Sequence, residues 1–171
     1  MKIKRKDVKL MKITLFDNEI IYGVFVSKSH KWIDVWKLDD HCINGRLLIR
    51  RKAIFKMTKC KMSKFMFKVL KENKEFKKIN TTVDHNIVHS LNDLDMLTMI
   101  NDETSVPLLV QCVSNEMYIG TIKCIGKKKF GLRLYKLNGG RFKNLHKFKY
   151  RDIYMYHIES DYGKVYQKYG K

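Results

Sequence analysis

Asp39, Asp40 and His41 are adjacent in the sequence and are the side chains best suited to acid–base catalysis. Such catalysis needs titratable groups held in a fixed mutual geometry. Neighbouring aspartates are equally typical of a turn, because their carboxylates accept hydrogen bonds from nearby backbone N–H groups. The sequence has no phosphate-binding glycine loop, nucleophile elbow or metal-binding helix motif. We therefore expect a protein that is not an enzyme and has no small-molecule substrate.

The spacing of the cysteines also argues against a metal site. The chain has four, none of them in a Cys-x-x-Cys pair: Cys42, Cys60, Cys112 and Cys124. A structural zinc site needs closely spaced cysteine and histidine ligands, and His41 beside Cys42 is the only neighbouring pair of that kind. The sequence predicts reduced, mostly buried thiols, with no metal and no cofactor.

The charge of the chain indicates a polyanionic partner. Lys and Arg number 36 against 17 Asp and Glu, a formal net charge of +19. The basic excess lies in residues 1–80 and 108–171, whereas residues 81–107 have acidic residues and no Lys or Arg. A strongly basic protein binds nucleic acid by releasing counterions, which favours RNA as a partner. The alternative is a lysine-rich surface that serves solubility alone.

No segment predicts contact with a membrane. The chain has no apolar run near the roughly 20 residues that a spanning helix needs. The amino-terminal sequence "MKIKRKDVKL" is basic but lacks the apolar segment of a signal peptide. We expect a cytoplasmic protein.

These candidate residues must be positioned by a block that occurs twice in the chain. Asn18, Glu19 and Gly23 correspond to Asn115, Glu116 and Gly120, which lie 97 positions later. "VWKLD" and "KAIF" in the first block correspond to "LYKLN" and "RDIY" in the second, 99 positions later. A repeated sequence block usually marks a repeated structural unit, so we expect two similar domains.

Each block has the residue pattern of short strands joined by tight turns. The runs "MKITLF" and "LLVQCV" lead into polar "DN" and "SN" turns, and stretches rich in β-branched and aromatic residues follow. Gly23 and Gly120 lie inside strand patterns, where glycine often marks a bulge or sharp bend. The sequence predicts a mainly β fold of two tandem, small five-stranded barrels, at residues 8–60 and 91–160.

Residues 61–90 form a basic and then acidic connector between the barrels. Its stretch "KMSKFMFKVLKENKEFKK" places apolar residues on one helical face, although "KFMFKVL" also alternates like a strand; we predict a helix. Ser90 and Asp93 form a weak capping box at the start of a second helix that leads into the second barrel. Residues 161–171 form a Tyr- and Lys-rich tail, which we expect to dock on the barrel rather than stack on bases.

Short motifs in both blocks are similar to those of one protein family. The second block has a Val106–Pro107 entry into its first strand, a turn at Asn115 and a Gly120-x-Ile122 step. The first block ends in "IRRKAIFKM", a basic pair followed by Ala-Ile. These motifs, with a short helix before five bent strands, resemble the Sm-like (LSm/Hfq-like, SH3-like barrel) fold and imply two tandem copies of it. Asp152 departs from the family, which has alanine there.

The resemblance implies RNA-binding surfaces in both blocks. The first-block residues in the matching positions are Lys31, Trp32, Arg50, Arg51 and Lys52. The second-block set is Lys127, Lys128, Lys129, Phe130, Lys149, Tyr150 and Arg151. The residue types suit single-stranded RNA, because an aromatic face stacks a base while cations hold phosphate. Because Asp152 adds an acid to the second set, we expect the first block to bind more strongly. Alternatively, Trp32 belongs to the core and the basic run is a solvated strand edge.

Two functions from different classes are therefore open. The first is a protein that binds single-stranded RNA through basic and aromatic surfaces. The second is a non-catalytic oligomerisation or protein-interaction scaffold whose basic surface meets an acidic partner. In either case unpaired edge strands favour association, so a homo-oligomer is expected more than a monomer.

Overall fold

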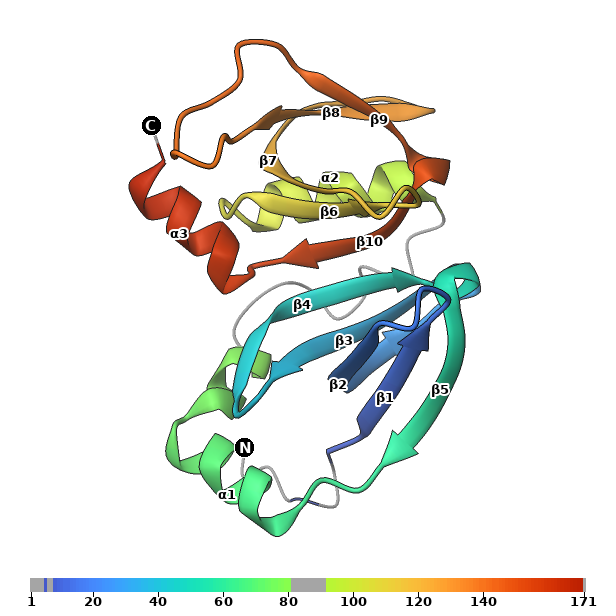
Figure 1. Cartoon of the computed structure of the whole chain (residues 1–171), viewed down its shortest axis with the longest axis vertical. Helices are drawn as coiled ribbons and strands as arrows, with labels where there is room; N and C mark the ends of the chain where they lie inside the picture. The colour runs from blue at the N-terminus through green and yellow to red at the C-terminus, as the bar shows by residue number, and fades with distance from the viewer. Residues whose placement is uncertain (1–4, 6–7, 81–91, 171) are drawn as a thin grey trace.

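The first half of the chain forms five consecutive antiparallel strands (Figure 1). The computed structural model describes residue 5 and residues 8–80 and 92–170. The strands are β1 (Leu10–Leu15), β2 (Ile20–Lys28), β3 (Trp32–Asp39), β4 (Cys42–Arg50) and β5 (Ile54–Cys60). Strands β1 to β4 pair in order, and β5 returns to pair with β1. Ile13 and Leu15 are buried on either side of the more accessible Thr14, as expected of a strand that covers a core with one face.

The second half repeats this arrangement after a helix, α2 (Asp93–Glu103). Its strands are β6 (Leu108–Cys112), β7 (Met117–Ile125), β8 (Lys129–Leu134), β9 (His146–Lys149) and β10 (Ile153–Ile158). Strands β6 to β9 pair in order, and β10 returns to pair with β6. The turns match as well, because Asn18 and Asn115 both have positive φ values, of 67° and 64°, which asparagine adopts more readily than most residues.

The two halves are joined through one pair of strands. β4 pairs with β10, which gives a single ten-stranded sheet in the order β5-β1-β2-β3-β4-β10-β6-β7-β8-β9. The prediction of a mainly β fold is confirmed, but the prediction of two closed five-stranded barrels is wrong. Closure of a half would require its fourth strand to pair with its fifth, whereas in the described residues the outer edge of β4 is taken by β10.

Glycine is required at one point where the two halves meet. Gly45 has φ +67°, and a Cβ atom there would lie 2.4 Å from the carbonyl oxygen of Ile158 in β10. A side chain at this position would therefore collide with the partner strand as well as strain the backbone. Gly23 has a different role within the first half, because a Cβ atom there would lie 2.9 Å from the Val35 side chain.

The hydrophobic core crosses the junction. Trp32 and Leu48 from the first half are buried in one cluster with Phe130, Leu132 and Tyr156 from the second. Their burial removes apolar surface from water on both sides of the β4–β10 pair. The two halves therefore share part of their core. The first half also buries an ion pair, in which Arg46 Nε donates to Asp34 Oδ1 at 2.8 Å.

Three α-helices surround the strands in the described part of the chain. α1 (Lys64–Glu72) lies in the segment predicted to be helical; Ser63 caps it, and Leu70 is buried against the first half. A short 3-10 helix, η3 (Glu75–Asn80), follows. Residues 81–90, including the predicted cap Ser90, lie outside the described residues, and Asn92 caps α2 by accepting from the Asp95 N–H.

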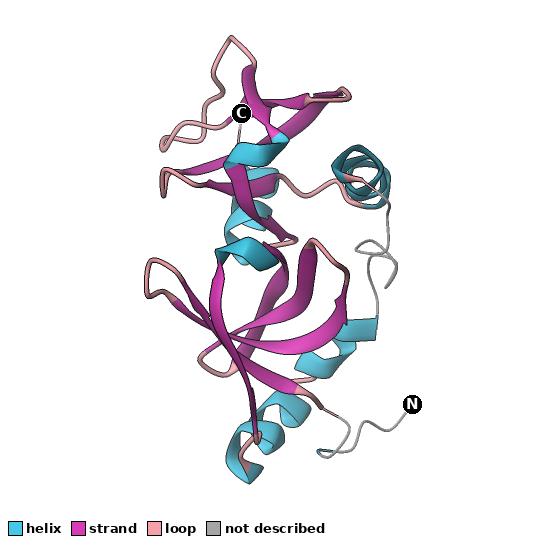
Figure 2. Cartoon of the chain, turned by 90° about the vertical axis from the view of Figure 1, so that its right-hand side faces the viewer, coloured by secondary structure: helices cyan, strands magenta, loops and turns pink. Residues whose placement is uncertain are grey.

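α2 lies beside the strands of the second half (Figure 2) and buries Met96, Leu97 and Ile100 in the shared core. α3 (Asp161–Tyr169) closes one end of that half, where Tyr166 is buried against Tyr135. Among the described residues, no helix is long and apolar enough to cross a membrane.

Candidate nucleic-acid interface

The three aromatic residues predicted to stack on bases are all buried. Trp32, Phe130 and Tyr150 are 3%, 0% and 7% exposed. Trp32 Nε1 donates to the Asp93 carboxylate at 3.2 Å, and the Phe130 ring packs 5.4 Å from the Phe148 ring. Tyr150 donates its hydroxyl to the carbonyl oxygen of Gly126 at 2.8 Å, and burial raises the pKa of Tyr150 to about 12. None of these rings presents a face on which a base could stack.

Arg50 is also engaged inside the protein, at the junction of the halves. Its guanidinium donates to the carbonyl oxygens of Ile153 and Tyr150 at 2.7 and 2.8 Å. It also forms an ion pair with Asp93 at 2.9 Å and lies over the Trp32 ring at 4.4 Å. Because its Nε and Nη2 groups already have protein acceptors, Arg50 acts as a link between β4, β10 and α2. We call Arg50, together with these four contacts, the Arg50 link.

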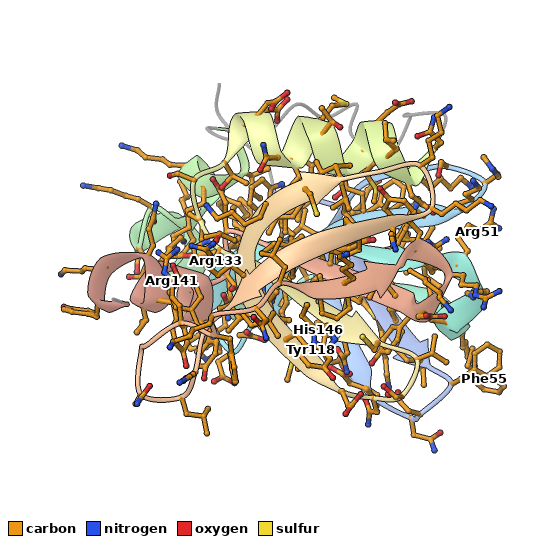
Figure 3. The ribbon with its side chains drawn as sticks, turned by 90° about the horizontal axis from the view of Figure 1, so that it is seen from above. Arg51, Phe55, Tyr118, Arg133, Arg141 and His146 are labelled. Carbon is orange, nitrogen blue, oxygen red and sulfur yellow. The ribbon has the colours of Figure 1, made fainter. Side chains whose placement is uncertain are left out.

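The remaining predicted cations are exposed: Lys31, Arg51, Lys52, Lys127, Lys128, Lys129, Lys149 and Arg151. Two of these cations, one from each block, lie close together. Lys52 Nζ donates to the carbonyl oxygen of Arg151 at 3.3 Å. These two residues lie on short 3-10 turns, η2 (Arg51–Ala53) and η5 (Tyr150–Asp152), on one side of the molecule (Figure 1). Arg51 extends from this side, away from Arg133 and Arg141 (Figure 3). This surface can contact phosphate groups but lacks the predicted stacking partners.

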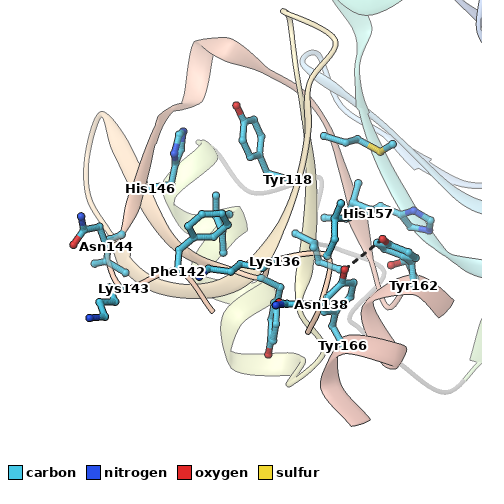
Figure 4. Close-up of a pocket in the computed structure, with 18 of the residues that line it drawn as sticks. Tyr118, Lys136, Asn138, Phe142, Lys143, Asn144, His146, His157, Tyr162 and Tyr166 are labelled. Atoms are coloured by element: carbon cyan, nitrogen blue, oxygen red, sulfur yellow. Dashed lines mark hydrogen bonds between the residues drawn. The ribbon is translucent and has the colours of Figure 1, made fainter. Parts of the chain in front are cut away.

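Accessible rings instead gather in a groove of about 1300 Å³ on the second half (Figure 4), which we call the aromatic groove. Its walls come from β7, from the connection between β8 and β9, and from α3, and its floor continues to β3 and β4 of the first half. The lining side chains with rings or amino groups are Tyr118, Tyr135, Phe142, His146, His157, Tyr162, Tyr166, Lys37, Lys136 and Lys143.

The connection between β8 and β9 folds back over the groove because of its turn residues. Gly139 has φ +81°, and the Gly140 N–H donates to the Asn138 side chain at 3.1 Å. The turn lets Tyr135 pair with Arg141, whose guanidinium lies 4.7 Å from the Tyr135 ring and donates to its hydroxyl at 2.8 Å. This pairing places Phe142, which is 48% exposed, on the wall of the groove.

Tyr118 and His146 also line the groove (Figure 4). Their rings are stacked, with centroids 5.0 Å apart and planes inclined by 27°. Buried Phe148 supports both rings, at 5.2 and 4.6 Å. Tyr118 on β7 and His146 on β9 thus form a pair of stacked rings that both pack on Phe148. Rings held in this way lose little conformational entropy when a ligand stacks on them.

The groove is positively charged. Lys136 lies over the Phe142 ring at 5.4 Å, and Lys143 follows on the same connection. Among the residues that line the groove in the described chain, none carries a carboxylate. Lys37 forms an ion pair with Asp39 at 2.9 Å. An anion in the groove would therefore meet cations and amides without repulsion from an acid on its wall.

His157 lies where the groove meets a second, smaller pocket. Its Nε2 lies 2.6 Å from the Asn44 carbonyl oxygen, which only accepts, so this nitrogen carries the proton. Burial lowers the pKa of His157 to about 4, so the ring is neutral near pH 7. The adjoining pocket, of about 640 Å³, is lined by Asp17 and Glu19, and burial raises the pKa of Glu19. The carboxylates of Asp17 and Glu19 thus lie in the adjoining pocket, which shares Lys37 and His157 with the aromatic groove.

The residues first considered for catalysis have structural roles. Asp39 accepts from Asn44 at 2.7 Å in addition to Lys37, and Asp40 has a positive φ of 47° in the turn between β3 and β4. The His41 ring packs edge-on against Phe65 of α1. In the part of the chain that the structure describes, no group of three His, Cys, Asp or Glu side chains is arranged to hold a metal ion.

Sequence reasoning missed most of the groove. Tyr118, Phe142, His146, Lys136 and Lys143 were not among the predicted binding residues. A signal was present in "KLNGGRFKNLHK", where turn residues are followed by aromatic and basic residues. A glycine-rich turn makes a connection accessible, so its rings are more exposed than rings on strands. The contribution of Tyr118 had no such signal, because it depends on the position of β9.

The fold and the groove define a mainly β protein that repeats one five-stranded unit and carries an aromatic, lysine-lined groove on its second half. Comparisons of the chain with protein-family models, curated proteins and solved structures found no match.

Proposed function

We propose that the protein binds single-stranded RNA, with bases in the aromatic groove. The observation that carries the proposal is the combination of accessible rings and lysines on walls without a carboxylate. Stacking of a base on an aromatic side chain contributes about 1 to 3 kcal/mol and tolerates different bases. Lysines beside the rings can neutralise the phosphates that follow each base.

Two further observations support the proposal. The formal net charge of +19 favours a polyanion, and Lys52 and Arg151 are exposed cations outside the groove. The Sm-like resemblance adds an expectation of RNA binding, and the second half has the helix followed by five strands that this resemblance implies. In this proposal the predicted cations hold phosphate, while Phe142, Tyr118 and His146 replace Trp32, Phe130 and Tyr150 as stacking residues.

Binding of labelled oligouridine RNA, measured by fluorescence anisotropy at several salt concentrations, tests the proposal. Phe142→Ala should weaken binding about tenfold or more and leave the salt dependence unchanged, because it removes a stacked base and no phosphate neutralisation. Lys136→Ala with Lys143→Ala should reduce the slope of log K against log salt by about 0.7 for each phosphate that these lysines neutralise. Phe55→Ala is the matched control, because Phe55 is an exposed ring on β5, outside the groove.

Equal effects of Phe142→Ala and Phe55→Ala would contradict the groove as the binding site. Single-stranded DNA of matching sequence shows whether the ribose contributes. If neither nucleic acid binds at physiological salt, the alternative of a protein-interaction scaffold is favoured. One observation specifically supports that second function: the exposed edge of the first half, which is separate from the groove.

A further inference from the structure

Strand β5 is the last strand of the ten-stranded sheet, and its outer edge has no neighbouring strand in the described chain. The direction of its backbone groups follows from the hydrogen bonds of β1. Leu15 N–H donates to Glu19 on the β2 side, whereas Phe16 N–H donates to Ala53 on the β5 side. Because successive residues of a strand point their N–H groups to opposite sides, Thr14 and Lys12 also face β5.

The partners of Thr14 and Lys12 are Lys56 and Thr58, so these two residues point their backbone groups towards β1. The alternate residues, Met57 and Lys59, point their N–H and C=O groups to the free edge. This edge is therefore a row of donors and acceptors that an added antiparallel strand can satisfy.

The repeat shows what covers such an edge. β10 is the equivalent of β5, and its outer edge is paired with β4. Tyr154 and Tyr156 on β10 are 7% and 0% exposed, whereas their equivalents on β5, Phe55 and Met57, are 67% and 38% exposed. The same positions are thus covered by a strand in one half and left open in the other.

Exposed apolar side chains adjoin this edge. Phe55 extends outward (Figure 3) and packs edge-on against Phe16, with the ring centroids 5.9 Å apart. Phe16 is also 67% exposed. A shallow pocket of about 290 Å³ next to Phe16 is lined by Val113 and Tyr154, and by Asp17 as its one carboxylate among the described residues.

The charge of the edge selects the kind of strand that fits it. β5 carries Lys56 and Lys59 and no acidic residue, and Lys52 and Lys61 flank it. The other free edge of the sheet, β9, carries Lys147 and Lys149. Any pairing of two free edges from two copies would therefore place lysines beside lysines, and like charges on neighbouring strands are destabilising.

We propose that β5 is a strand-addition site for an extended segment of another protein in which apolar residues alternate with aspartate or glutamate. Main-chain hydrogen bonds to Met57 and Lys59 supply register, apolar residues pack against Phe55 and Met57 on one face, and acidic residues lie beside Lys56 on the other face. The site is independent of the aromatic groove and does not rest on the proposed RNA binding.

A labelled synthetic peptide in which Val and Glu alternate tests the site, with Val-Lys and Gly-Glu peptides of the same length as controls. We expect the Val-Glu peptide to bind more tightly than both controls, and to slow amide hydrogen exchange at Met57 and Lys59. Reversal of charge by Lys56→Glu should shift the preference from the Val-Glu peptide to the Val-Lys peptide. This change of preference between the two peptides can be measured whatever the absolute affinity of each.

Met57→Pro removes an N–H that faces the free edge and keeps the β1–β5 ladder, so it should weaken binding of the Val-Glu peptide about tenfold or more. Lys147→Pro is the matched control, because Lys147 is the repeat equivalent of Leu48 and faces the opposite free edge. Circular dichroism checks that each variant folds. RNA binding in the groove should be unchanged by Met57→Pro.

Three results would overturn the proposal. One is the absence of Val-Glu peptide binding, and another is equal binding by the unaltered chain and a folded Met57→Pro variant. The third is self-association in sedimentation experiments that Met57→Pro abolishes, because a second copy would then be the occupant of the edge.

Discussion

His157 is the buried titratable side chain with the clearest consequence for pH. It is 7% exposed, and burial lowers its pKa from 6.5 to about 4. The unfolded chain therefore takes up a proton at this residue before the folded chain does. The contribution to stability is fully present above pH 6.5 and is lost as the pH falls through about 4, by about 3 kcal/mol in total.

We expect His157→Gln, which keeps an N–H donor for the Asn44 carbonyl oxygen, to reduce this pH dependence. The measurement is urea unfolding at about pH 7 and about pH 4.5 for the unaltered chain and the variant. His30→Gln serves as the control, because His30 is exposed. If His30→Gln and His157→Gln change the pH dependence by equal amounts, burial of His157 is not the cause.

The residue scale also shows which features of the candidate site could not be predicted from the sequence. Trp32 has the residue type of a stacking side chain, but the junction covers it, and its indole donates to Asp93. The strand pattern places Trp32 and Lys31 on opposite faces and does not show which face another half will cover. The open alternative, in which Trp32 belongs to the core, agrees with its burial. The exposure of Phe142 was more predictable, because a turn precedes it.

At the element scale, the Arg50 link stabilises the contact between β4, β10 and α2. Arg50→Met keeps much of the side-chain volume but removes the donor to two carbonyl oxygens and to Oδ2 of Asp93. We expect a loss of about 3 kcal/mol in the free energy of unfolding, measured in urea. Arg51→Met is the matched control, because Arg51 is exposed, and it should change stability by less than about 0.5 kcal/mol.

An effect of Arg50→Met no larger than that of Arg51→Met would show that the link adds no net stability. A buried charge pair can behave in this way when desolvation cancels its attraction. The apolar contacts of Trp32 and Leu48 would then hold the junction without it.

The elements themselves were more predictable than their closure. The repeat indicated five strands in each half, and turn residues such as Asn18 and Asn115 gave their order. The helix within residues 61–90 was predicted from apolar spacing, and α1 occupies part of that range. The closure of each half into a barrel was predicted wrongly, because it depends on which strand pairs with the outer edge of β4. Both β10 and β5 have strand patterns, and no local signal separates them.

At the scale of the whole molecule, the shared core predicts a single unfolding transition. Both tryptophans, Trp32 and Trp36, lie on β3, so their fluorescence reports the first half. Far-ultraviolet circular dichroism reports both halves. We expect the two signals to give the same midpoint in urea, because loss of the second half would uncover Trp32 and Leu48. Two separate midpoints would mean that the halves unfold independently.

The pairing of β4 with β10 also affects how the chain is made. Arg50 and its acceptor Ile153 are 103 residues apart, so the junction forms only after the ribosome has synthesised the second half as far as β10. Until then the outer edge of β4 has no partner strand, and Trp32 and Leu48 lack the core contacts that the second half supplies. Long-range pairing of this kind is slow, and exposed apolar edges promote aggregation. Synthesis of this protein should therefore depend on chaperones more than its size suggests.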